Sequence, residues 1–169
     1  MTSRVGCGVD AHRFAAGRPL VLCGVTVPHE RGLAGHSDAD AATHAVIDAL
    51  LGAAGLGDVG ALFPDDDPAW EGAVSVELLA RVAALVRGEG WEVGNVDVTI
   101  VCERPRLSPY REAMRARLAA ALGVPAAAVG VKATTTEGMG FAGRGEGVAA
   151  MAVCLLERRG LPAAGPAAQ

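Results

Sequence analysis

Apolar residues recur along the chain at intervals that predict three helices. The clearest run has the spacing of one helix face and consists of Ala42, Ala45, Val46, Ala49, Leu50 and Ala53. It predicts a helix over residues 37–54 with Ser37 as its N-cap, and with Asp38 and Asp40 in a first turn whose dipole favours negative charge. Further helices are predicted over residues 75–88 and 108–123, where Pro109 suits the first helical position.

Shorter apolar runs, several of them alternating with polar residues, predict the strands. Strands are expected over residues 5–10, 93–102, 129–134 and 148–156, with a hairpin over residues 19–27 that turns at Cys23 and Gly24. Residues 57–72 are predicted to be a loop. Strands alternate with helices, and we expect the strands at both ends of the chain to pair as hairpins. The pattern predicts an α+β fold, a mixed β-sheet with helices packed on one face, and another subunit covering the other face.

Composition limits the classes of function. The 169-residue chain is 51% hydrophobic but 4% aromatic, which suits one domain with a core of Ala, Val and Leu. A net charge of −4 argues against a nucleic-acid binder held by a basic field. No apolar run approaches the ~20 residues of a membrane span and no signal pattern opens the chain, so we expect a cytoplasmic protein without membrane or nucleic-acid partners. We predict one domain over residues 1–159 and a disordered Pro-, Ala- and Gly-rich tail over residues 160–169.

A cluster of histidines and aspartates suggests a metal site. Asp10 and His12 are two residues apart in a predicted strand and share one face, while Asp40 and His44 are four apart on a predicted helix. Two histidines and one carboxylate would make a three-ligand catalytic site with an open position. Spacing alone leaves Asp10 and Asp40 as alternative carboxylate ligands. The plainer alternative is a surface Asp–His pair, with Asp38 and Asp40 complementing a helix dipole.

Three other segments carry groups suited to a phosphorylated substrate. The consecutive aspartates after Phe63 and Pro64 indicate a solvated loop, a cation site or a hinged lid, and Asp58 could contact a substrate hydroxyl. The Thr run in residues 132–137 offers donors to phosphate oxygens, and Glu137 adds an oxygen ligand of the kind Mg²⁺ takes. The Gly-rich segment 140–147 permits close backbone approach to a ligand but also simply forms turns.

These motifs, in this order, resemble the 2-C-methyl-D-erythritol 2,4-cyclodiphosphate synthase family. The matching stretches lie within residues 8–147 and read GVDAHRF, LAGHSDADAATHAVIDALLGAAGLGDVGALFPDDD, NVDVTIVCERPRLSPY and VKATTTEGMGFAGRGEG. The resemblance implies a homotrimer with its sheets towards the trimer interior and active sites between subunits. It implies conversion of 4-diphosphocytidyl-2-C-methyl-D-erythritol 2-phosphate to the 2,4-cyclodiphosphate with release of CMP, in the non-mevalonate isoprenoid pathway.

The same resemblance assigns roles to residues near the reacting phosphates. Asp10, His12 and His44 would hold Zn²⁺, which selects Asp10 over Asp40, and Glu137 would help to hold Mg²⁺ or Mn²⁺ on the diphosphate. His36 and Thr135 would stabilise the transition state.

The remaining assignments concern the ends of the substrate and the trimer axis. The methylerythritol part would be held by Asp58, Gly60, Phe63, Pro64, Asp65, Asp66 and Asp67, and further substrate contacts would come from Ser37, Val59 and Thr136. The cytidine and its phosphates would be held by Cys102, Glu103, Arg104, Pro105, Arg106, Leu107, Ser108 and Thr134. The resemblance links Phe141 and Arg144 to a central cavity of the trimer, where an isoprenoid diphosphate could bind.

Two positions depart from the family pattern. Ala39 stands where Gly is usual, which changes little if the helix accepts Ala, and Arg106 replaces Lys, which keeps the charge but alters hydrogen-bond geometry. Two other functions would use part of the same residue set. A metal-dependent phosphoesterase would need the His/Asp cluster but give a linear product. A non-catalytic nucleotide-binding trimer would need the cytidine segment but not His36 or the metal ligands.

Overall fold

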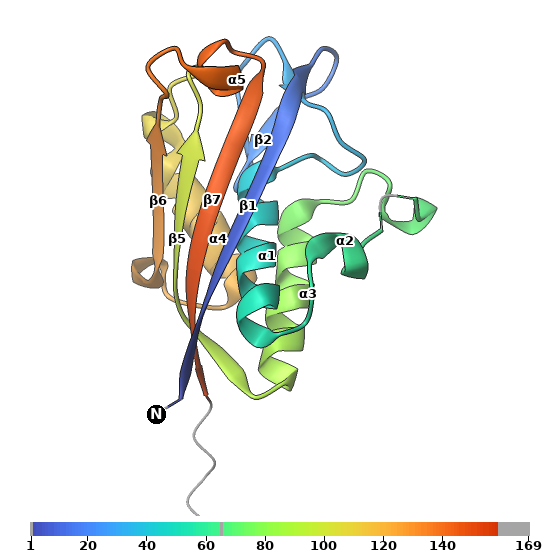
Figure 1. The fold of residues 1–169 in the computed structure, drawn as a ribbon, viewed down its shortest axis with the longest axis vertical. Helices are drawn as coiled ribbons and strands as arrows, with labels where there is room; N and C mark the ends of the chain where they lie inside the picture. The colour runs from blue at the N-terminus through green and yellow to red at the C-terminus, as the bar shows by residue number, and fades with distance from the viewer. Residues whose placement is uncertain (1, 65, 159–169) are drawn as a thin grey trace, which may run out of the picture.

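The computed structural model describes residues 2–64 and 66–158, whose strands form a five-stranded mixed sheet and a two-stranded hairpin (Figure 1). The predicted tail over residues 160–169 and Asp65 lie outside the described residues. In spatial order the large sheet consists of β4 (Gly32–Leu33), β1 (Ser3–Ala15), β7 (Gly147–Arg158), β5 (Trp91–Val101) and β6 (Val129–Thr134). Only β5 and β6 run parallel, so the predicted mixed sheet is confirmed.

Helices cover one face of this sheet, as expected. The three longer ones are α1 (Ala41–Ala54), α3 (Ser75–Gly88) and α4 (Arg111–Leu122). Short turns of helix interrupt the connections, namely α2 (Val59–Leu62), α5 (Gly140–Gly143) and the 3₁₀ turns at Pro68–Trp70, Ser108–Tyr110 and Ala126–Ala128. None of the helices in the described residues is both long enough and apolar enough to cross a membrane.

One of the two predicted hairpins is present. β2 (Leu20–Leu22) pairs with β3 (Val25–Val27), and Cys23 and Gly24 turn the chain with positive φ at both residues, as a type I′ turn requires. The expectation that the last two strands pair is wrong, because β7 lies between β1 and β5 while β6 lies at the sheet edge. The connection over residues 135–146, which includes α5, is long enough to carry the chain across β5.

The predicted N-cap of the first long helix is also wrong. Asp40 caps α1, and its carboxylate accepts hydrogen bonds from Thr43 N at 3.0 Å, Thr43 Oγ1 at 2.7 Å, Cys23 N at 2.8 Å and Gly24 N at 2.7 Å. Burial raises the pKa of Asp40 and these donors oppose the rise. A buried carboxylate used in this way ties the hairpin turn to the helix and is not available as a metal ligand.

Ala39 therefore lies outside the helix. Its φ is 57°, a left-handed conformation that costs a residue with a Cβ about 1 kcal/mol. The expectation that Ala changes little here depended on a helical backbone. Gly would adopt this conformation without that cost.

Direct contact between β1 and α1 positions the ligands that these elements carry. A Cβ on Gly6 would lie 1.9 Å from Ala49 O, and a Cβ on Gly8 would lie 2.0 Å from Ala45 O. Only Gly allows the helix backbone to approach the strand so closely. Asp10 and His12 continue the same face of β1 beyond these glycines.

The opposite face of the sheet is apolar along β1 and β7. Val5, Val9, Met151 and Val153 are 69%, 62%, 49% and 41% exposed, and the register places them side by side. The adjoining part of this face is polar, with an ion pair between Asp97 and Lys132. A contiguous exposed apolar patch of this kind is typical of a protein–protein interface.

Candidate active site

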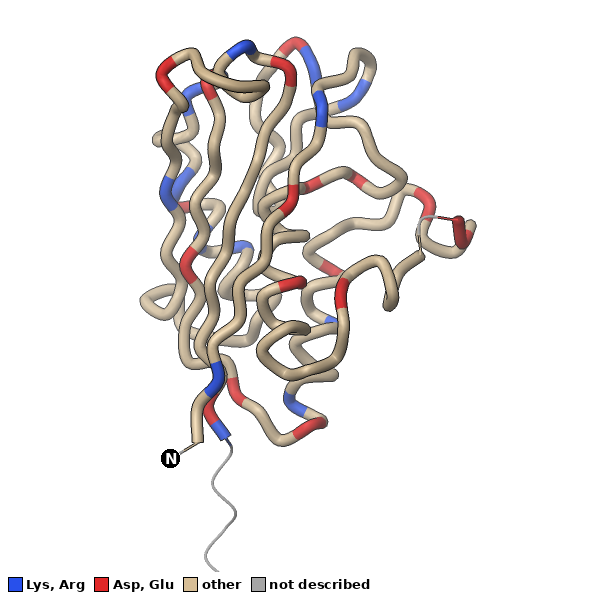
Figure 2. Tube along the Cα trace, in the orientation of Figure 1, with Lys and Arg blue, Asp and Glu red and all other residues tan. Residues whose placement is uncertain are grey.

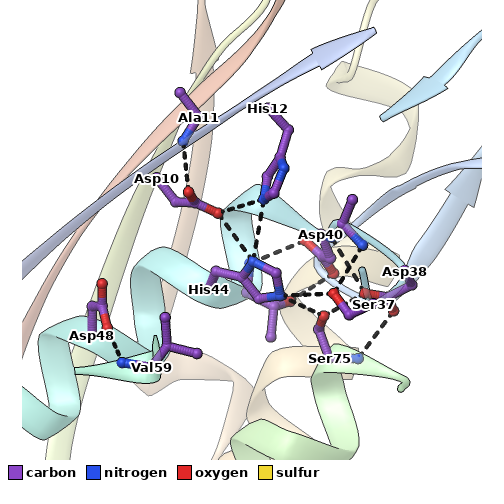
Figure 3. Close-up of polar contacts among 12 residues, drawn as sticks. Asp10, Ala11, His12, Ser37, Asp38, Asp40, His44, Asp48, Val59 and Ser75 are labelled. Carbon is purple, nitrogen blue, oxygen red and sulfur yellow. Dashed lines mark hydrogen bonds and ion pairs between the residues drawn. The ribbon is translucent and has the colours of Figure 1, made fainter. Parts of the chain in front are cut away.

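The predicted metal ligands converge where β1 meets α1 (Figure 3). Asp10 Oδ2 lies 2.9 Å from His12 Nε2 and 3.0 Å from His44 Nδ1, and the two ring nitrogens are 3.4 Å apart. Ligands at tetrahedral angles around Zn²⁺, with bonds of about 2.0–2.1 Å, lie roughly 3.3 Å apart. The cluster therefore fits a divalent metal, and the carboxylate in it is that of Asp10.

The outer nitrogen of each imidazole is hydrogen-bonded to the protein. His12 Nδ1 faces Ala34 O at 2.7 Å, and because a carbonyl only accepts, His12 carries its proton on Nδ1 and turns a lone pair on Nε2 towards Asp10. His44 Nε2 faces Ser75 Oγ at 2.9 Å. Metal-binding histidines show this arrangement, in which a protein acceptor orients the ring from behind.

The carboxylate of Asp10 is held in its charged form. Burial by itself would raise the pKa of Asp10, but its contacts with the imidazoles of His12 and His44 outweigh burial and hold the pKa well below its usual range. Asp10 Oδ1 accepts a further hydrogen bond from Ala11 N at 2.8 Å. The carboxylate of Asp10 and the two imidazoles beside it together form the ligand set of a cation site.

A pocket of about 160 Å³ opens beside this cluster. Its other walls are formed by Gly35, His36, Ser37, Val59, Gly60, Phe63, Trp70 and Leu78. The α2 segment is held against α1 by Asp48, whose Oδ1 accepts a hydrogen bond from Val59 N at 2.7 Å. Burial raises the pKa of Asp48 more than this hydrogen bond lowers it. Asp48 lies one turn after His44, so one helix carries both a metal ligand and the anchor of the neighbouring loop.

The predicted cytidine segment lines a different and larger pocket of about 1050 Å³. Residues 102–108 form one side, and His29, Glu30 and Ala133 to Thr135 form the rest. The carboxylate of Glu103 accepts hydrogen bonds from Thr136 N at 2.8 Å, Thr136 Oγ1 at 3.2 Å and Gly138 N at 3.4 Å. These bonds lower the pKa of Glu103 and fix the Thr-rich loop against residues 102–108.

The predicted second-metal residue belongs to this loop. Glu137 is exposed, has a left-handed φ of 54° and accepts a hydrogen bond from Thr135 Oγ1 at 3.0 Å. Phe141 is 42% exposed. Arg144, which pairs with Glu146, lines a third pocket together with Arg31 and Arg104.

Charge separates the two principal pockets. Residues 32–80, which supply most of the metal pocket, contain acidic residues but no Lys or Arg. In Figure 2 red positions follow the α2 segment, whereas blue and red positions occur together at the end of the sheet next to α5. Arg104 and Arg106 line the larger pocket together with Glu30 and Glu103. The metal pocket, which no Lys or Arg lines, is suited to a cation, and the two guanidinium groups of the larger pocket are suited to phosphate groups.

The structure brings some predicted site residues together and separates others. Asp10, His12, His36, Ser37 and His44 share one pocket with Val59, Gly60 and Phe63. Pro64, Asp66 and Asp67 continue the loop beyond it, whereas Thr134 and Thr135 line the larger pocket. Sequence reasoning missed Ser75 and Asp48, because a single Ser at the first position of a helix and a single Asp within a helix carry no motif.

Comparison with known proteins identifies the family. The model of the YgbB family matches residues 3–157. The chain belongs to the YgbB family. Members with curated names include the 2-C-methyl-D-erythritol 2,4-cyclodiphosphate synthase of Rubrobacter xylanophilus, 61% identical over 92% of this chain and 95% of its own length. The bifunctional enzyme IspD/IspF of Desulforudis audaxviator is 60% identical over 94% of this chain, which spans 40% of that protein.

A solved structure in the YgbB family supports the same fold. The structure of a 2C-methyl-D-erythritol-2,4-cyclodiphosphate synthase, described as its CDP-bound form, superposes with a TM-score of 0.84 at 42% identity. The superposition covers 91% of this chain and 100% of the chain in the solved structure. The predicted α+β fold with a mixed sheet and helices therefore agrees with a solved family member.

Proposed function

We propose that this chain converts 4-diphosphocytidyl-2-C-methyl-D-erythritol 2-phosphate to 2-C-methyl-D-erythritol 2,4-cyclodiphosphate and releases CMP, as a step of isoprenoid biosynthesis. The observation that carries the proposal is the convergence of Asp10, His12 and His44 beside His36 in one pocket. Membership of the YgbB family, with high identity to named cyclodiphosphate synthases, supports it.

The metal at Asp10, His12 and His44 is proposed to be Zn²⁺, since two imidazoles and one carboxylate are a common zinc donor set. A bound divalent cation would neutralise phosphate charge and orient the reacting phosphates. We assign a second cation, Mg²⁺ or Mn²⁺, to the diphosphate, with Glu137 as its protein ligand. An exposed carboxylate on a loop beside Thr135 is suited to that role.

The protein's own residues position the substrate and stabilise charge. His36 and Thr135 are proposed to stabilise the charged transition state, and the Asp58–Gly60 segment with residues 63–67 to hold the methylerythritol part. The 2-phosphate oxygen attacks the β-phosphorus, the bond from that phosphorus to the CMP oxygen breaks, and CMP leaves with the bond's electron pair. Phosphate oxygen is already a nucleophile, so positioning and charge neutralisation account for most of the catalysis.

We further propose that the active protein is a homotrimer with its sheets towards the interior. Two observations support it: the cation pocket and the cytidine pocket are separate within one chain, and the open sheet face is apolar along β1 and β7. Neighbouring subunits would bring the two pockets together, with residues 102–108 and 134–136 of one facing Asp10 and His36 of the next. Phe141 and Arg144 are then candidates for the central cavity and an isoprenoid diphosphate within it.

The decisive experiment is phosphorus NMR of the purified protein with the cytidyl diphosphate substrate, Zn²⁺ and Mg²⁺. We expect CMP together with two coupled resonances from a cyclic diphosphate. CMP with a linear phosphate product would instead identify a phosphoesterase. No turnover by the folded, metal-loaded protein would favour a nucleotide-binding function.

A further inference from the structure

The hydrogen bonds to His44 Nε2 suggest a role for Asp38 and Ser75, to which the proposed reaction assigns no role. His44 Nε2 lies 2.9 Å from Ser75 Oγ and 3.3 Å from Ser37 Oγ (Figure 3). Ser75 is fully buried at the first residue of α3. A hydroxyl can donate or accept, so the proton on His44 depends on where the hydrogen of Ser75 points.

The carboxylate of Asp38 fixes the direction of the Ser75 hydroxyl hydrogen. Ser75 Oγ donates to Asp38 Oδ1, and Ser75 N donates to Asp38 Oδ2 at 3.0 Å. An ionised carboxylate offers only acceptors, so the hydroxyl hydrogen of Ser75 is committed to Asp38. Ser75 Oγ then presents lone pairs to His44, and the proton of the imidazole lies on Nε2. The lone pair of His44 Nδ1 is left facing Asp10.

We propose that Asp38 and Ser75 form a positioning relay that fixes His44 in its Nε2–H tautomer and so directs Nδ1 towards the cation. The inference rests on the proposed metal site but not on the cyclase reaction. A His44 with its proton on Nδ1 could not bind a metal through that atom. Outer partners of this kind typically change metal affinity 10–100-fold when they are removed.

The main chain holds the relay in place. Asp38 N donates to Ala73 O at 3.1 Å, and Gly72 N donates to His36 O at 3.0 Å, so residues 36–38 run against residues 72–75. The N-cap residue of α3, Val74, has no side-chain cap, and Asp38 supplies that acceptor from 37 residues away. The same carboxylate therefore caps α3 and orients Ser75.

The first test is Asp38→Asn in the full chain. The Asn carbonyl can still accept from Ser75 N, which leaves its NH₂ group facing Ser75 Oγ. The hydroxyl must then turn its hydrogen towards His44 Nε2, which favours the Nδ1–H tautomer. Two-bond ¹H–¹⁵N spectra of the metal-free protein distinguish the two tautomers. We expect His44 to change from Nε2–H to Nδ1–H and the affinity for Zn²⁺ alone, measured against a chromophoric chelator, to fall 10–100-fold.

Two further variants separate this role from a general effect on α3. Ser75→Ala removes the acceptor and should also weaken Zn²⁺ binding at least tenfold. Glu77→Gln is the matched control, since it removes an exposed carboxylate from the first turn of the same helix without touching Ser75 or His44. It should leave both the tautomer and Zn²⁺ affinity unchanged.

The proposal is overturned if Asp38→Asn keeps the Nε2–H tautomer with Zn²⁺ affinity within twofold of the parent. A lower melting temperature with an unchanged tautomer overturns it as well, because Asp38 would then only cap α3. Failure of the proposed reaction is a separate result: the parent would bind Zn²⁺ and show the Nε2–H tautomer but give no cyclic product.

Discussion

The close contact between β1 and α1 predicts that adding one methyl group, in Gly8→Ala, destabilises the protein strongly. In Gly8→Ala the new Cβ would lie 2.0 Å from Ala45 O, 2.7 Å from Ala49 N and 2.9 Å from Asp48 Cβ. Two of these atoms belong to the helix backbone and cannot rotate away. The helix must therefore move outward, and with it His44 moves relative to Asp10.

The expected cost is large for so small a change. Overpacking a core costs about 1–3 kcal/mol where side chains can adjust, so we expect roughly 3 kcal/mol or more for Gly8→Ala. For a chain of this size that corresponds to a melting temperature lower by about 6–12 °C. Circular dichroism during urea and thermal unfolding measures both quantities.

Gly52→Ala is the matched control. Gly52 lies in α1, but a Cβ there would meet no atom within 4 Å. Replacing an exposed helical Gly should raise the free energy of unfolding by about 0.5–1 kcal/mol. The reasoning is refuted if Gly8→Ala stays within about 0.5 kcal/mol of the parent, or if both variants shift stability in the same direction.

Three other predictions follow from the site and the core. Asp48→Ala should raise KM more than it lowers kcat, because Val59 N loses its hydrogen-bond acceptor. Asp48→Asn keeps an acceptor and should retain most of the parent KM. A KM of Asp48→Ala equal to that of the parent would contradict this role. His44→Ala should lose bound zinc in equilibrium dialysis while its circular dichroism is unchanged, and retention of stoichiometric zinc would exclude His44 as a ligand. Burial raises the pKa of Cys102 and of Cys154 to about 11, so stability should fall between about pH 9 and pH 11 as the unfolded chain loses these protons first. Replacing both thiols by Ala should make that part of the curve less steep, with the buried thiol of Cys23, whose pKa burial also raises, accounting for a remaining fall. An identical pH dependence would show that Cys102 and Cys154 do not contribute.

The sequence predicted the helices and strands well where the periodic pattern of apolar residues extended over many positions. It failed where a distant residue decided the local structure. Ser37 is a reasonable N-cap by composition, but Asp40 has that position because its carboxylate also binds the amides of Cys23 and Gly24. The pairing of β7 with β1 and β5 likewise depends on contacts that alternation within a strand does not reveal.

The candidate site likewise contains some residues that the local sequence could place and others that depend on distant contacts. Asp10 and His12 could be placed on one face because a strand alternates, but the choice of Asp10 over Asp40 required the resemblance to a family. The fold gives the physical reason, since the oxygens of Asp40 already accept four hydrogen bonds. Ser75 lies 31 residues from His44 in the chain, and no sequence spacing predicts that their side chains meet.

The carboxylate of Asp40 also has a consequence for the order in which structure is lost. A two-stranded ribbon such as β2–β3 is barely stable by itself and usually frays early. Here the amides at its turn donate to the residue that begins α1, so the turn cannot open without releasing the start of that helix. We therefore expect the ribbon and helix α1 to unfold as one cooperative unit, with the Cys23 and Gly24 amides exchanging with solvent as slowly as the helix core.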